Sequence, residues 1–222
     1  MVSLELEQRL WEQGVSMVAF CDEVGRGPLL GSVVAAAVIM PVGLYIEGVD
    51  DSKKLTAKKR ESLYDIISEK ALAVGIGEVD NRRIDQMNIR QASRLAMKKA
   101  VLNLKNREGM SVNPGFLFVD GVETVDLALP QERVIHGDTI SHGIAAASIL
   151  AKVFRDRRCL AWDSLYPAYG IAGHKGYCTR GHLDALLKLG PTPLHRLSFL
   201  KNILARATFE QQVLFQSLDS KG

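Results

Sequence analysis

The sequence predicts an α/β protein whose mixed sheet is covered by helices. Two apolar segments joined by a short turn come first, and the later apolar segments alternate with stretches of helical spacing. This order favours a mixed sheet over a β-sandwich or a helix bundle. The chain has 222 residues, of which 47% are hydrophobic, and this is enough for a sizeable core. We therefore expect one main domain, or a domain with a small appendage.

Five short apolar segments have the composition of buried strands. The first ends in acid and is followed by a tight glycine- and proline-containing connection at 25–28. The fourth follows a turn at 113–115 and also ends in acid, while the fifth leads into Gly137 and Asp138. The predicted strands cover residues 18–22, 32–40, 72–79, 116–119 and 133–136.

Helices are expected where apolar residues recur three or four positions apart. Thr56 and Thr179 are suitable N-cap residues for the helices that follow them, and Asn88 with Gln91 resembles a capping box. The longest helix has a face of small residues, which allows a close approach to the sheet, and Pro167 ends it. The predicted helices cover residues 57–71, 89–104, 144–162, 180–189 and 198–214.

Composition and charge exclude several classes of protein. The net charge of +3 permits a polyanionic partner but does not require one. The three cysteines are odd in number and widely spaced, so we expect reduced thiols rather than disulfides or a zinc cluster. The N-terminus lacks the pattern of a signal peptide, and the most apolar stretch, 33–40, is too short to span a bilayer. We expect a soluble, cytoplasmic, monomeric protein.

Acidic residues follow three of the predicted strands, and these acids are the candidate catalytic residues. They are Asp22 with Glu23, Asp120, and Asp138. Open α/β sheets tend to build their sites at the carboxyl ends of strands. Clustered carboxylates suit hard cations such as Mg²⁺ or Mn²⁺, and two such ions can hydrolyse a phosphodiester. The alternative is ordinary loop solvation, which is the more common role of an isolated Asp-Gly pair such as Asp120-Gly121.

Further motifs extend this pattern along the chain. CDEVGRGPLLG occupies 21–31, and in order there follow DDSKKL at 50–55, DQMNI at 85–89, DG at 120–121, GD at 137–138, IAAASILAKV at 144–153, RDR at 155–157, YG at 169–170, HKGY at 174–177, HR at 195–196 and SF at 198–199. This ordered set closely resembles ribonuclease HII, the type 2 ribonucleases H. The resemblance implies a ribonuclease-H-like fold with a mixed five-stranded sheet flanked by helices. It also implies a catalytic core at 1–164 and a C-terminal helical extension, 165–222, packed on that core.

The resemblance also implies an activity and a set of site residues. Four carboxylates, at Asp22, Glu23, Asp120 and Asp138, would hold two Mg²⁺ or Mn²⁺ ions. The expected substrates are RNA/DNA hybrids and duplex DNA with a single ribonucleotide, cut 5′ of the ribonucleotide to leave a 3′-hydroxyl and a 5′-phosphate. The residues that would bind substrate are Gly25, Arg26 and Gly27 at the ribose 2′-hydroxyl, Tyr177 at the junction from RNA to DNA, and Lys53, Lys54 and Lys175 near the nucleic-acid backbone.

Plain structural roles stand beside several of these assignments. The lysines could be ordinary solvated side chains, and Tyr177 could be a half-buried structural tyrosine. The chain departs from the family pattern at His136 and at 139–143, where His142 could be a proton shuttle or a loop histidine without a special role. Residues 211–215, QQVLF, loosely resemble a peptide that binds the sliding clamp, although a plain amphipathic tail is the simpler reading. Another nuclease or integrase of the same fold, or an inactive hybrid-binding module, remain alternatives.

Overall fold

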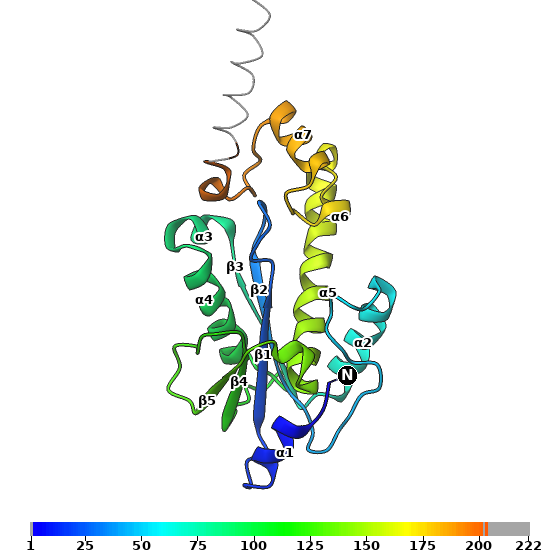
Figure 1. The fold of residues 1–222 in the computed structure, drawn as a ribbon, viewed down its shortest axis with the longest axis vertical. Helices are drawn as coiled ribbons and strands as arrows, with labels where there is room; N and C mark the ends of the chain where they lie inside the picture. Colours follow the sequence, from blue (N-terminus) through cyan, green and yellow to red (C-terminus); the bar gives the residue numbers. More distant parts are fainter. Residues whose placement is uncertain (1, 202, 204–222) are drawn as a thin grey trace, which may run out of the picture.

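A five-stranded mixed sheet forms the centre of the molecule (Figure 1). The computed structural model describes residues 2–201 and 203. The strand order is β3-β2-β1-β4-β5, in which β1 pairs antiparallel with β2 and parallel with β4. The predicted fold class is therefore confirmed. The strands are β1 (Val18–Val24), β2 (Val33–Ile39), β3 (Ala73–Val79), β4 (Phe116–Asp120) and β5 (Gln131–Val134).

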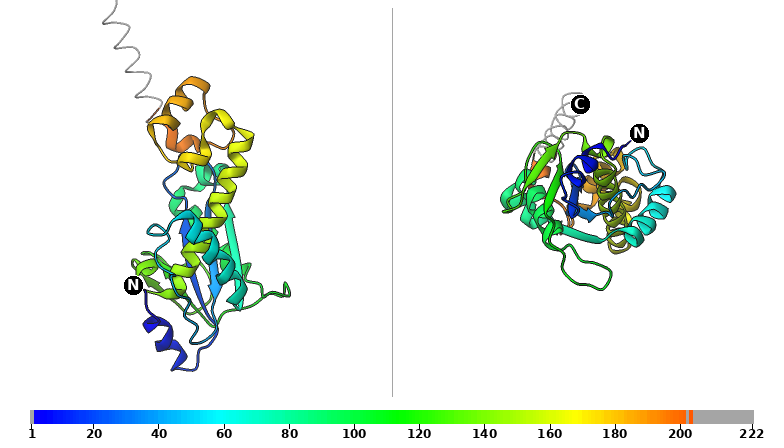
Figure 2. Two further views of the ribbon diagram at one scale, coloured as in Figure 1. Left: turned by 90° about the vertical axis from the view of Figure 1, so that its right-hand side faces the viewer. Right: turned by 90° about the horizontal axis from the view of Figure 1, so that it is seen from below.

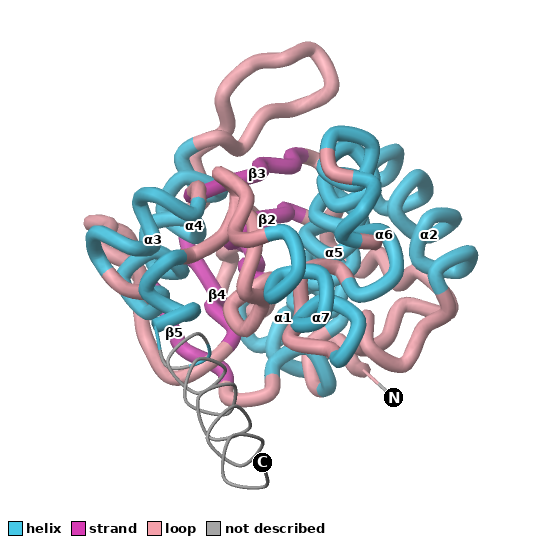
Figure 3. Tube along the Cα trace, turned by 90° about the horizontal axis from the view of Figure 1, so that it is seen from above, coloured by secondary structure: helices cyan, strands magenta, loops and turns pink. Residues whose placement is uncertain are grey.

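Helices cover both faces of this sheet (Figures 2 and 3). On one face, α4 (Ile89–Leu102) packs on β3 and β2 through buried small residues such as Ala96 and Ala100. On the other face, α5 (His142–Leu165) lies against β1 and β2, and α2 (Ala57–Lys70) packs on α5. Each interface encloses its own apolar cluster, so the sheet is buried on both sides. Packing on both faces therefore holds β1 and β4 in place, and these two strands lead to the acidic site.

Three short helices were missed by the sequence analysis: α1 (Glu5–Trp11), α3 (Asn81–Met87) and α6 (Ile171–His174). The first two have seven residues and the third has four, and such short segments show little helical periodicity. The α3 helix begins with a local signal all the same, because the Asp80 side chain accepts a hydrogen bond from the Arg83 backbone N–H at 2.8 Å.

Several predicted boundaries were wrong, and three of these differences have a clear physical reason. The first strand continues through Glu23 to Val24 because β2 pairs with it along that whole length. The fifth strand ends at Val134, two residues before the predicted end, because the backbone of His136 is left-handed, with φ of 57°, and opens the 3₁₀ helix η1 (Gly137–Thr139). The helix α5 begins two residues early because the Ser141 hydroxyl caps the N–H of Ile144.

The segment after α5 folds over the connection between β1 and β2. It contains η2 (Pro167–Tyr169), α6 (Ile171–His174) and α7 (Arg180–Leu189), which lie together near the top of Figure 1. Backbone hydrogen bonds join the connection to this segment from Leu29 to Gly176 and from Gly31 to Leu194. The division into 1–164 and 165–222 stays a prediction, and of the predicted tail helix only residues 198–201 and 203 are described.

Two expectations from composition can be examined in the described residues. Cys21, Cys159 and Cys178 are all free thiols, as expected. Within 2–201 and 203, no helix is both long and apolar enough to cross a membrane.

Candidate metal centre

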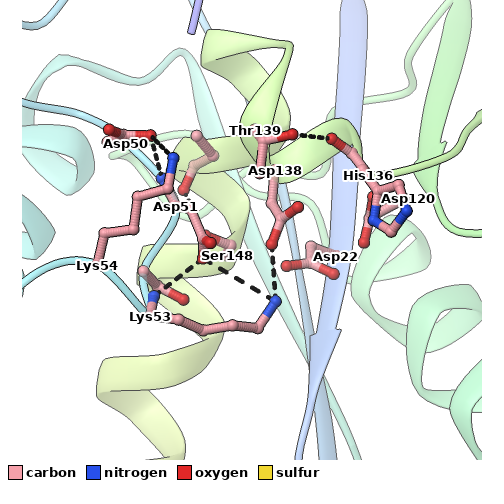
Figure 4. Close-up of polar contacts among 12 residues, drawn as sticks. Asp22, Asp50, Asp51, Lys53, Lys54, Asp120, His136, Asp138, Thr139 and Ser148 are labelled. Atoms are coloured by element: carbon pink, nitrogen blue, oxygen red, sulfur yellow. Dashed lines mark hydrogen bonds and ion pairs between the residues drawn. The ribbon is translucent and has the colours of Figure 1, made fainter. Parts of the chain in front are cut away.

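Three carboxylates from different elements meet at one point (Figure 4). Asp22 lies within β1, Asp120 ends β4, and Asp138 lies in η1. Each offers an oxygen atom, and these atoms all lie within 4.8 Å of one another. Asp22 and Asp138 are only 7% and 4% exposed, so this is an enclosed cluster rather than three solvated surface acids. The structure therefore brings together three of the four predicted acids.

Asp138 reaches the cluster by a route that strand ends did not predict. It lies four residues beyond the end of β5, and the η1 turn folds it back toward the sheet. The backbone N–H of Gly137 donates to Asp120 Oδ1 at 2.6 Å, which ties the turn to β4. Lys53 Nζ donates to Asp138 Oδ2 at 2.9 Å. Asp138 is thus fixed both through its own turn and by a lysine from a distant loop.

The electrostatics of the cluster favour a cation. Burial raises the pKa of Asp22 well above its ordinary value, and the charges of Glu23, Asp120 and Asp138 raise it further. Burial also raises the pKa of Asp120, with Asp138 as the next cause. Buried carboxylates that repel one another ionise together only when positive charge is supplied. An enclosed set of three oxygen ligands fits a hard divalent ion, so the cluster is a divalent-metal site.

Glu23 lies beside this cluster but outside the group of three. Its Oε1 accepts a hydrogen bond from Arg26 Nη1 at 3.0 Å. Burial raises the pKa of Glu23, while the neighbouring Arg26 charge opposes that shift. The side chain lines a cavity of about 260 Å³ together with Asp120, Arg90 and Arg94. A metal-binding role for Glu23 therefore stays a proposal.

The glycine turn and the predicted junction tyrosine lie side by side. A Cβ atom on Gly27 would come 3.6 Å from Cε1 of Tyr177, which is van der Waals contact. The Tyr177 side chain is 44% exposed, so its ring is available to a ligand. Gly25 has φ of 88°, a conformation that favours glycine over any other residue. The structure thus places two predicted recognition elements on one surface, beginning three residues after Asp22.

The three predicted lysines have different surroundings. Lys53 contacts the acids directly. Its hydrogen bond with Asp138 raises the pKa of the Lys53 ammonium, although burial acts in the opposite direction. Lys54 is paired with Asp50 at 3.1 Å and is not part of the acidic cluster. Lys175 lines a separate cavity of about 160 Å³ between α2 and α5. Only Lys53 of the three therefore contacts the clustered acids, and Figure 4 shows its bond to Asp138.

The residues that anchor the start of α5, the helix that follows the Asp138 turn, were not predicted from the sequence. The buried Glu7 side chain of α1 accepts hydrogen bonds from the Ser141 hydroxyl at 2.7 Å and the Gly143 N–H at 2.8 Å. His142 is fully buried at the start of α5, where its Nε2 accepts from the Ile46 N–H at 2.9 Å. This position makes His142 a packing residue of the helix start rather than a loop histidine. No local signal links residue 7 to residue 141, because the contact exists only in the folded chain.

Comparisons with known proteins point to one family. The family model described as ribonuclease HII matches residues 20–202. A ribonuclease HII from Alkaliphilus metalliredigens is 60% identical over 201 residues, which cover 90% of this chain and 98% of that protein. A second, from Alkaliphilus oremlandii, is 54% identical and covers 92% of this chain and all of its own.

Solved structures show the same fold at lower identity. Ribonuclease H2 from Pyrococcus horikoshii has a TM-score of 0.67 and 23% identity, with 82% of this chain and 92% of that chain covered. A ribonuclease HII of Archaeoglobus fulgidus, solved in complex with PCNA, has a TM-score of 0.65 and 22% identity, with 82% and 93% covered. The extent of the family match and the high identity to whole relatives establish that this chain belongs to the ribonuclease HII family.

Proposed function

We propose that this protein hydrolyses the RNA strand of RNA/DNA hybrids and cuts duplex DNA on the 5′ side of a single embedded ribonucleotide. The observation that carries the proposal is the enclosed group of Asp22, Asp120 and Asp138, a few residues from a glycine turn in which Arg26 and Gly27 are exposed. Family membership supplies the class of substrate. The products would be a 3′-hydroxyl and a 5′-phosphate, and the action is that of a metal-dependent endonuclease.

The acids would hold two Mg²⁺ or Mn²⁺ ions, with Glu23 joining the three clustered aspartates. Bound ions of this kind activate the attacking water and stabilise the leaving oxygen of the phosphodiester. Asp22 is held in place by its strand and by the Glu23 N–H, which donates to Asp22 Oδ1 at 2.7 Å. Lys53 fixes the orientation of Asp138 and offsets part of the local negative charge. The protein thus supplies rigid, preorganised ligands.

Selection of the ribonucleotide would belong to the adjoining surface. The backbone of Gly25, Arg26 and Gly27 would contact the ribose 2′-hydroxyl, because a turn without Cβ atoms at both ends permits close approach. Tyr177 would stack against the sugar at the following RNA-to-DNA junction, since its exposed ring lies beside Gly27. Lys54 and Lys175 would contact phosphates on the flanking backbone.

One experiment separates this proposal from its rivals. Three labelled duplexes are incubated with the protein and Mg²⁺, Mn²⁺ or chelator: one with a single ribonucleotide, one RNA/DNA hybrid and one of DNA alone. We expect metal-dependent cutting of the first two only. Asp22→Asn should abolish cutting while binding persists, whereas Asp184→Asn, on the exposed surface of α7, should cut like the wild type. Cutting of all three duplexes at similar rates would indicate another nuclease, and binding without cutting in either metal would indicate a binding module.

The role of Tyr177 has its own test. Tyr177→Ala should slow cutting of the single-ribonucleotide duplex more than cutting of a long hybrid, because only the former always presents the junction. An equal loss on both would contradict the junction role.

The predicted clamp-binding peptide at 211–215 lies outside the described residues. A titration of the sliding clamp with full-length protein and with residues 1–203 tests whether this peptide binds the clamp.

A further inference from the structure

Arg196 is a buried cation in the segment that follows α7. Its side chain is completely buried, and within 2–201 and 203 no ion pair involves it. Burial lowers its pKa to about 9, with the charge of Arg155 as the next cause. A buried charge without an acidic partner is costly unless its N–H groups are fully hydrogen-bonded. The hydrogen-bond acceptors of the guanidinium therefore indicate the structural role of Arg196.

All three acceptors are backbone carbonyls around the glycine turn. Arg196 Nη2 donates to the Gly25 oxygen at 2.6 Å, and Nη1 donates to the Arg26 oxygen at 2.8 Å. Nε donates to the Gly31 oxygen, also at 2.8 Å. The rigid, planar guanidinium thus joins two consecutive peptide groups of the turn to the far side of the same connection.

The backbone of Arg196 and of the two residues after it is also anchored by hydrogen bonds. The Arg196 backbone N–H donates to the Leu29 oxygen at 2.8 Å. Asp85 of α3 accepts from the N–H groups of Leu197 and Ser198, each at 2.9 Å, so the next two residues are anchored as well. The ring of Phe199 lies 5.2 Å from the guanidinium carbon. These contacts fix the position of Arg196, and Arg196 in turn fixes the position of the turn.

Fixing these carbonyls also fixes the N–H groups of the turn. In a trans peptide the C=O and the following N–H point in opposite directions, and the described chain has no cis peptide. The N–H groups of Arg26 and Gly27 must therefore point away from the buried guanidinium. Neither has a hydrogen-bond acceptor among the described residues. Two free, oriented donors next to the metal centre are suited to a ligand oxygen.

We propose that Arg196 is the positioning residue that sets the N–H groups of Arg26 and Gly27 for the oxygen of a ribose 2′-hydroxyl. This inference rests on the proposed function. It assigns to the segment after α7 a share in choosing the substrate, although that segment supplies none of the acids. Lysine cannot replace the arginine here, because a single ammonium lacks the spread of donors that reaches three separate carbonyls.

The test compares Arg196→Lys and Arg196→Gln with the wild type. Leu63→Ala is the matched control, because Leu63 of α2 is 1% exposed in the core where α2 packs on α5. In chelator, fluorescence anisotropy gives the ratio of affinities for the single-ribonucleotide duplex and the same duplex in all-DNA form. We expect the Arg196 variants to reduce this ratio about tenfold, because two hydrogen bonds to the 2′-hydroxyl would be weakened together. Leu63→Ala should lose stability and retain the ratio.

A second measurement does not depend on substrate. Amide spectra of protein labelled with ¹⁵N-glycine should show displaced resonances for Gly25, Gly27 and Gly31 in both Arg196 variants and unchanged ones in the control. Arg196→Lys retains the positive charge, so it supplies the result if the glutamine variant does not fold. Wild-type affinity ratios and glycine spectra in a folded Arg196 variant would overturn the positioning role alone. A wild type without any ribonucleotide preference would instead overturn the proposed function, and this inference with it.

Discussion

Substituting Gly25 by alanine should destabilise the protein far more than the same substitution at Gly14. Both glycines have left-handed backbones, with φ of 88° and 82°, so both variants carry a strain of about 1–2 kcal/mol. At Gly14 the new Cβ meets nothing within 4 Å. At Gly25 it would lie 2.2 Å from Arg155 Nε and 2.6 Å from Arg155 Cδ. Only Gly25→Ala must therefore also displace a buried arginine.

The cost of that displacement follows from the contacts of Arg155. This fully buried side chain donates to the backbone oxygens of Lys175 at 3.0 Å, Ser32 at 3.3 Å and Leu30 at 3.4 Å. Loss of a single hydrogen bond from a charged donor costs about 1.5–3 kcal/mol. Gly25→Ala should therefore lose about 2.5–5 kcal/mol in all, against about 1–2 kcal/mol for Gly14→Ala.

Urea unfolding followed by circular dichroism measures both values, and the change in unfolded-state entropy is shared by the two variants. A thermal scan should show the same order, with about 2–4 °C lost for each kcal/mol in a chain of this size. Equal losses at the two positions would refute the reasoning, because they would mean that Arg155 moves aside without cost.

Three further outcomes are expected. Mg²⁺ or Mn²⁺ should raise the melting temperature of the wild type and not that of Asp22→Asn, which without metal should be at least as stable as the wild type because it removes a buried charge. Burial lowers the pKa of His195 from 6.5 to about 4, so the folded state binds fewer protons than the unfolded state. Stability should then fall by about 3 kcal/mol as the pH drops from 6.5 to 4, and His195→Asn should flatten this dependence in urea titrations at each pH. A thiol reagent should modify one cysteine per native chain, the exposed Cys178, and all three in denaturant.

The sequence predicted those parts of the site that depend on local pattern. Asp22 and Asp120 follow strongly apolar residues, and parallel pairing of β1 with β4 then brings them together. Asp138 was selected for the same reason, although it reaches the cluster through the η1 turn. Its position depends on the Gly137 bond to Asp120 and on Lys53, which are contacts between residues far apart in the chain.

The arginines that set the glycine turn could not be assigned a role from sequence. Arg155 and Arg196 were visible only as members of motifs, and arginine is usually an exposed residue. Their burial follows from the way in which α5 and the segment after α7 close over the β1–β2 connection. That closure is a tertiary event, so neither periodicity nor capping signals could predict it. The same is true of Glu7, whose partners lie more than 130 residues away.

The metal centre and the turn share one short stretch of chain, and this bears on where the substrate is cut. Asp22 is part of β1, and the turn follows directly at Gly25. Four residues of extended chain span at most about 14 Å, so Asp22 and Arg26 lie within a few nucleotides of each other. Because β2 pairs with β1 as far as Val24 and Arg196 holds the next two carbonyls, little freedom remains between the acids and the turn. A ribonucleotide bound at the turn would therefore present the same phosphodiester to the acids each time, and a fixed cleavage position needs no further contact with the bases.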